Sequence, residues 1–202
     1  GIVAEDYKTD QVTDENVLDK TITTFDNFND TLITQLYEKG SLAIEEMQKG
    51  FNPEANECFI FKNNSSSVLA RFDPKAKRIM RVEKNPAYGI KPRNAEQTFS
   101  LDVLMDPELK LIALTGKAGT GKTLLALAAA IEQHSNFDQI LLARPIVALS
   151  NRDLGYLPGD ASEKINPYMQ PLFDNLAVIK HSFNPRSKEY LQIEELQKEE
   201  KL

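Results

Sequence analysis

A glycine- and lysine-containing segment in the middle of the chain has the residue types and spacing of a phosphate-binding loop. Residues 116–123 match the pattern G-x-x-x-x-G-K-[ST] at every fixed position. The segment consists of Gly116, Lys117, Ala118, Gly119, Thr120, Gly121, Lys122 and Thr123, and Leu124 follows it. A polyphosphate carries several negative charges, so a site for it needs many donors at close range. The pattern therefore predicts a nucleotide-binding site over residues 116–124.

Each fixed residue of this segment has a chemical reason to be there. The glycines lack a Cβ, so the backbone can adopt positive φ and bring its N–H groups close to phosphate oxygens. We expect Lys122 to contact the β- and γ-phosphates and the Thr123 hydroxyl to bind Mg²⁺, which makes both candidate catalytic residues. The alternative is a chance glycine-rich turn between a strand and a helix.

The flanks of the loop favour the functional interpretation. Residues 109–115 form an apolar run of strand length, and residues 124–131 are rich in strong helix formers. A second apolar run at 137–143 follows the helix. Strand, helix and strand in this order predict an α/β fold with parallel pairing and a right-handed crossover.

Residues 93–105 are predicted to form a helix just ahead of the loop. Asn94 is a good N-cap, and Gln97 stands three residues further on, as in a capping box. The Gln97 carboxamide, with one acceptor oxygen and two donor hydrogens, also matches the edge of an adenine. The two roles compete for one side chain, and both stay open at this point.

The rest of the chain divides by composition. Residues 1–20 are irregular, and residues 21–84 predict a small, mostly β module with strands at 58–62, 67–72 and 78–82. Segments 30–37 and 41–47 fit either a helix or a strand. Residues 85–92, with two prolines and a glycine, predict a linker into a phosphate-loop domain over 93–202.

Charge and composition narrow the classes of partner. The net charge is −6, yet residues 71–93 carry eight basic residues against two acidic ones. Such a span either contacts phosphates or is an ordinary solvated hairpin face. One cysteine and two histidines exclude an internal disulfide and disfavour a zinc site. No apolar run is long enough to span a membrane, so we expect a cytoplasmic protein without a membrane partner.

Four segments, in order, resemble the PhoH family, the phosphate-starvation-inducible ATPases related to superfamily 1 helicases. The segments are residues 93–97, 115–128, 144–147 and 155–160. The resemblance implies a RecA-like parallel sheet core, with ATP and Mg²⁺ as cofactors and Gln97 as the adenine-reading residue. It also implies a homo-oligomeric ring and a parent protein that acts on single-stranded RNA. Residues matching the RNA-contacting region of helicase relatives are Arg144, Asn151, Arg152 and Tyr156.

The sequence also departs from the family pattern. After Thr123 no apolar strand ends in the acidic residues that orient Mg²⁺ and the attacking water. We therefore expect a piece of a longer protein that binds nucleotide poorly or moderately and hydrolyses it little. The family resemblance also implies a PIN-type ribonuclease domain upstream in the parent chain. The alternatives are a small-molecule kinase with the same loop and a non-catalytic RNA-binding or assembly module. The absence of an Asn-Lys-x-Asp guanine motif disfavours a GTP switch.

Overall fold

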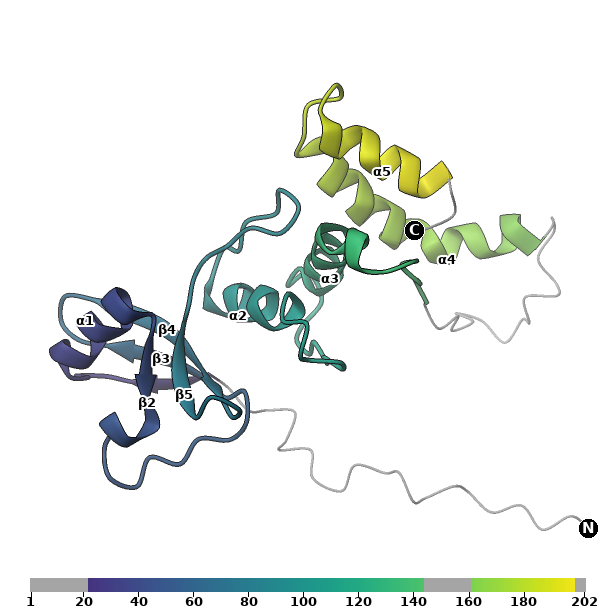
Figure 1. Cartoon of the computed structure of the whole chain (residues 1–202). Helices are drawn as coiled ribbons and strands as arrows, with labels where there is room; N and C mark the ends of the chain where they lie inside the picture. The colour runs from purple at the N-terminus through teal and green to yellow at the C-terminus, as the bar shows by residue number, and fades with distance from the viewer. Residues whose placement is uncertain (1–21, 144–160, 199–202) are drawn as a thin grey trace, which may run out of the picture. The chain divides into compact units, whose positions relative to one another are not determined.

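A computed structural model describes residues 22–143 and 161–198, which fall into two compact units (Figure 1). The first unit extends to Arg81, and the second begins at Val82. Within the described ranges, no helix combines the length and the apolar character needed to cross a membrane.

The first unit is built on a mixed five-stranded sheet. Its elements are β1 (Thr23–Phe25), α1 (Asp30–Lys39), β2 (Ser41–Ala43), the short 3₁₀ helix η2 (Ile44–Glu46), β3 (Cys58–Lys62), β4 (Ser67–Asp73) and β5 (Arg78–Val82). The strand order is β1-β3-β4-β5-β2. β1 pairs with β3 in parallel, whereas the β3–β4 and β2–β5 pairs are antiparallel.

Alternation along the strands explains the core of this unit. In β4 every second side chain is buried, from Val68 through Ala70 to Phe72, as the period of two in a strand requires. Phe59 and Phe61 on β3 alternate in the same way, and α1 adds the buried Ile33 and Leu36. The predicted strands at 58–62, 67–72 and 78–82 are confirmed. Of the two ambiguous segments, the first is helix α1 and the second is β2 followed by η2.

The described part of the second unit is helical. Its elements are α2 (Ala95–Leu104), α3 (Lys122–Glu132), the 3₁₀ helix η3 (His134–Asn136), α4 (Ala161–His181) and α5 (Lys188–Lys198). Helix α3 packs against both α2 and α4. It supplies much of the core through its fully buried residues, which are Leu125, Leu127, Ala128, Ala129 and Ile131. The predicted helices before and after the loop are confirmed.

The two predicted strands that flank α3 are wrong. Residues 109–115 and 137–143 form neither helix nor strand, and none of the strand pairs recorded for the described residues includes them. Leu111 and Leu141 remain 93% and 80% exposed. A strand needs a neighbour to take up its backbone hydrogen bonds, and an apolar run by itself supplies none. The sheet of this α/β structure is therefore the mixed one of the first unit, not a parallel one around the loop.

The segment predicted as a linker contributes to the second core. Ala87 and Tyr88 are buried there, and the Tyr88 backbone N–H donates to the Glu132 carboxylate at 2.7 Å. The Tyr88 hydroxyl lies 2.9 Å from the carbonyl oxygen of Glu189 on α5. Burial, followed by the charges of Glu189 and Glu132, raises the pKa of Tyr88 to about 12. Tyr88 thus ties α3 to α5.

Candidate nucleotide-binding site

The backbone of the predicted phosphate loop has the conformation that its glycines allow. Gly116, Gly119 and Gly121 have φ values of 140°, 78° and 89°. These values lie in the left-handed region, where a side chain would strain the backbone. The expectation of positive φ at the loop glycines is confirmed, so the residue types at these positions are explained by the turn they make.

Lys122 closes the loop from its carboxyl end. Its Nζ donates to the carbonyl oxygens of Gly116 and Lys117, both at 2.8 Å. The Thr120 hydroxyl donates to the same Lys117 oxygen at 2.9 Å. An ammonium group has three N–H donors, and two of them are used on the first residues of the loop. The loop is therefore held in a closed turn around a positive charge.

The helix that follows the loop begins without a side-chain cap. Helices α1 and α2 begin at Asn29 and Asn94, whose side chains accept from the first-turn N–H groups of Thr31 and Gln97. Helix α3 begins after Gly121, which makes no side-chain cap hydrogen bond. Its first-turn N–H groups and its positive dipole end thus remain available to an anion.

Loop residues 115–120 and Thr123 are exposed, and Lys122 and Thr123 border a cavity of about 690 Å³. Of the described residues that line it, these two carry polar side chains and the others are apolar. The apolar walls come from α2, α3, α4 and the segments on either side of α3; they include Leu104, Ile112, Leu114, Ala126, Leu127, Ala130, Ile140, Leu141, Leu142, Pro171 and Leu172. The polar end of the cavity is therefore at the start of α3.

The Gln97 side chain contacts the start of α2 and the phosphate loop, and its contact with an adenine stays a prediction. Asn94 caps α2 as predicted, because its Oδ1 accepts from the Gln97 N–H at 2.9 Å. The Gln97 side chain accepts from the backbone N–H of Arg93, one residue before the cap, and donates to Thr120 in the phosphate loop. It is therefore neither a complete capping box nor a carboxamide left entirely to a base.

The structure describes the remaining predicted site residues only in part. The candidate RNA-contacting residues Arg144, Asn151, Arg152 and Tyr156 lie outside the described residues. In the ranges that the structure does describe, no group of three or more His, Cys, Asp or Glu side chains is arranged to hold a metal ion. The predicted metal contact there is the exposed Thr123 hydroxyl.

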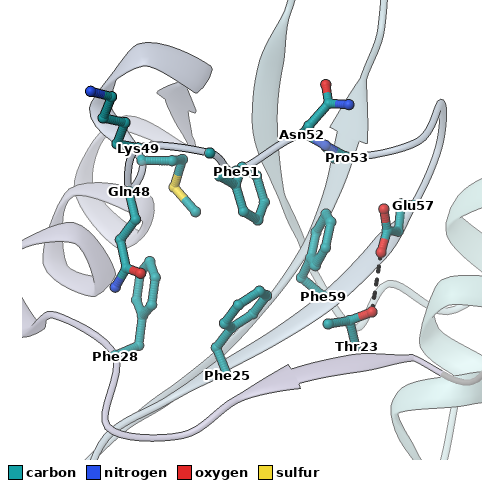
Figure 2. Close-up of a pocket in the computed structure, with 12 residues that line it drawn as sticks. Thr23, Phe25, Phe28, Gln48, Lys49, Phe51, Asn52, Pro53, Glu57 and Phe59 are labelled. Atoms are coloured by element: carbon teal, nitrogen blue, oxygen red, sulfur yellow. Dashed lines mark hydrogen bonds between the residues drawn. The ribbon is translucent and has the colours of Figure 1, made fainter.

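A second cavity, of about 340 Å³, lies in the first unit and was not predicted (Figure 2). Phe25, Phe51 and Phe59 surround it, and the Thr23 hydroxyl donates to the Glu57 carboxylate at its edge at 3.1 Å. The sequence signal was the concentration of five of the ten phenylalanines within residues 25–61. With one lysine and one glutamate among its lining residues, this cavity has none of the excess donors that a polyphosphate needs.

An exposed glycine-rich loop, closed by a lysine and leading into an uncapped helix, is the arrangement typical of phosphate-loop proteins. A family model described as PhoH-like protein matches residues 89–198, more than half of the chain. The chain belongs to the PhoH family, which is in general a family of phosphate-loop ATPases. The family indicated by the sequence segments is thus confirmed.

Curated relatives carry the same family names. Protein PhoH2 of Bacillus subtilis (strain 168) is 35% identical over 92% of this chain and 43% of its own length. Protein PhoH2 of Mycolicibacterium smegmatis is 41% identical over 55% of this chain and 26% of its own. Protein PhoH of Escherichia coli (strain K12) is 41% identical over 42% of this chain and 23% of its own. The chain thus spans less than half the length of these relatives. No solved structure matches it.

Proposed function

We propose that this chain binds ATP with Mg²⁺ through residues 116–124 and forms the nucleotide-binding part of a phosphate-loop ATPase. The observation that carries the proposal is the loop closed by Lys122 in front of the uncapped start of α3. A closed loop has already lost the conformational freedom that binding would otherwise cost. Membership of a family of phosphate-loop ATPases supports the same conclusion.

Each group of the loop has a role in this proposal. The N–H groups around Gly119 and Gly121, together with the first turn of α3, would hold the phosphates. The Lys122 ammonium, whose Nζ also lies 3.4 Å from the Thr120 hydroxyl oxygen, would turn from these loop contacts to the β- and γ-phosphates. The Thr123 hydroxyl would hold Mg²⁺, which neutralises phosphate charge when bound. Among the described residues that line the cavity, those other than Lys122 and Thr123 have apolar side chains and offer no competing polar side chain.

For the whole protein we propose a RecA-like ATPase coupled to single-stranded RNA, working in the cytoplasm as a ring and joined to a PIN-type ribonuclease domain. These points rest on the family resemblance.

The direct test of ATP binding is the substitution Lys122→Ala. Loss of a charge-assisted contact of about 1.5–3 kcal/mol should raise the ATP dissociation constant roughly tenfold to hundredfold. The matched control is Lys84→Ala, which removes an exposed lysine elsewhere in the second unit. Isothermal titration calorimetry would measure both variants. Equal ATP affinity in the wild type and in Lys122→Ala would refute the site.

Hydrolysis is tested separately. We expect this chain to bind ATP but to turn it over slowly, because no acidic strand end follows Thr123 in the sequence. Phosphate release should be measured with and without Mg²⁺, for this chain and for one extended at its carboxyl end. Fast magnesium-dependent release by the unextended chain would contradict this part of the proposal.

A further inference from the structure

The carboxamide of Gln97 joins two backbone segments that are distant in sequence. Its Nε2 donates to the Thr120 carbonyl oxygen at 3.2 Å, and its Oε1 accepts from the Arg93 N–H at 2.9 Å. A carbonyl needs a donor and an N–H needs an acceptor, so both contacts fix the same orientation of the amide group. One side chain thus connects the entrance of α2 to the phosphate loop.

The helix that carries Gln97 gives this connection a firm base. Asn94 caps α2, and the next two residues after Gln97, Thr98 and Phe99, are buried. Helix α2 packs directly against α3, the helix that begins at the loop (Figure 1). The carboxamide is therefore held at a defined distance from the loop.

The loop in turn leaves room for the carboxamide. A Cβ added at Gly121 would lie 3.2 Å from the Gln97 Nε2, which is tighter than most contacts of real Cβ atoms. Glycine at position 121 thus satisfies two requirements at once, namely its φ of 89° and the close approach of Gln97.

We propose that Gln97 is a positioning residue that orients the peptide between Thr120 and Gly121 for phosphate binding. In a planar trans peptide the C=O and the following N–H point in opposite directions. By holding the Thr120 carbonyl, Gln97 therefore directs the Gly121 N–H away from α2. This role deepens the proposed polyphosphate site and rests on it. It acts through the loop, so it does not depend on the base of the nucleotide.

If Gln97 acts through the loop, its effect on binding should be the same whichever base the ligand carries. This distinguishes the positioning role from adenine reading. The probe is inorganic tripolyphosphate, which has the phosphates of ATP and no base, compared with ATP and GTP. Gln97→Met keeps a long unbranched side chain but removes both hydrogen bonds. We expect this substitution to weaken the binding of all three ligands by a similar factor. The factor should be roughly twofold to tenfold, because one neutral hydrogen bond to the loop is lost.

The matched control is Asn94→Ala. It removes the cap of the same helix and lowers its stability, but leaves the Gln97 side chain in place. If Gln97 acts on the loop, Asn94→Ala should lower the melting temperature and leave tripolyphosphate affinity unchanged. If Gln97→Met and Asn94→Ala weaken tripolyphosphate binding equally, Gln97 only stabilises α2, and the positioning role is overturned.

Two further outcomes are decisive. Gln97→Met with weaker ATP binding but wild-type tripolyphosphate binding would assign the residue to the base and overturn the proposal. The Lys122→Ala variant distinguishes failure of the positioning role from failure of the phosphate site. If Lys122→Ala weakens tripolyphosphate binding but Gln97→Met does not, the positioning role alone is overturned. If Lys122→Ala leaves tripolyphosphate binding unchanged, the proposed phosphate site is refuted.

Discussion

Apolar segments form paired strands in the first unit but not in the described part of the second unit. In the first unit the apolar strands β3 and β4 pair along the whole length of β3, and Phe59 and Phe61 are buried. In the second unit two equally apolar runs flank α3 and form no strand in the described residues, and Leu111 and Leu141 are exposed. Composition is similar in both places, so the presence of a neighbour with free backbone groups decides whether a strand forms.

The phosphate loop nevertheless forms a closed turn, although the described residues of the second unit supply no strand next to it. Its contacts are short-range, since Lys122 bonds residues five and six positions before it, and Gln97 adds one contact from α2. The comparison therefore separates local from non-local structure within one chain. The loop is specified by its own residues, whereas the strands next to it require partners.

The largest effect on the free energy of unfolding is expected in the core of the first unit, where apolar strands pair. Phe61 is fully buried and stacks on Phe28 with 4.3 Å between ring centroids. Phe61→Ala should destabilise the first unit by about 3–5 kcal/mol, measured by urea unfolding. The counterpart in the unpartnered region is Phe137→Ala, where the ring is 64% exposed and the cost should stay below about 0.5 kcal/mol. Similar costs for the two phenylalanines would break the comparison.

A smaller effect is expected where the second unit is held together by a polar side chain. Tyr88→Phe removes the hydroxyl contact with Glu189 and should cost about 0.5–1.5 kcal/mol at neutral pH. Because the folded-state pKa of Tyr88 is raised to about 12, its hydroxyl stays protonated at a pH where the unfolded chain begins to ionise. The stability difference between wild type and Tyr88→Phe should be full below pH 10 and shrink as the pH rises toward 12. A difference that grows over this range would refute the assignment.

The smallest effect should come from an unpartnered apolar side chain. Leu111 is 93% exposed, so Leu111→Ser should change the free energy of unfolding by less than about 0.5 kcal/mol. The matched variant in the first unit is Leu42→Ala, at a fully buried position of β2, with an expected cost of about 2–5 kcal/mol. A large cost for Leu111→Ser in this chain would show that residues 109–115 have a partner in solution.

Local signals made much of the structure predictable. The hairpin strands follow from alternation, α2 from its Asn94 cap, and the loop from the spacing of its glycines. Each of these depends on residues close together in the sequence.

Non-local contacts could not be predicted. β1 was missed because a three-residue strand owes its existence to parallel pairing with β3, where Thr23 lies opposite Phe59. The contact between Gln97 and Thr120 spans 23 positions and depends on how α2 packs on α3. The aromatic cavity likewise needs the loop with Phe51 to return over β1 and β3 (Figure 2).

The most direct test of the account is a titration of the ¹⁵N-labelled chain with tripolyphosphate, followed by amide chemical shifts. The central claim is that residues 116–124 form a polyphosphate site. It predicts that the largest shifts occur at Gly119, Gly121, Lys122 and Thr123, and that they disappear in Lys122→Ala. Shifts centred instead on the aromatic cavity around Gly50 and Phe51, or none at the loop glycines, would contradict it.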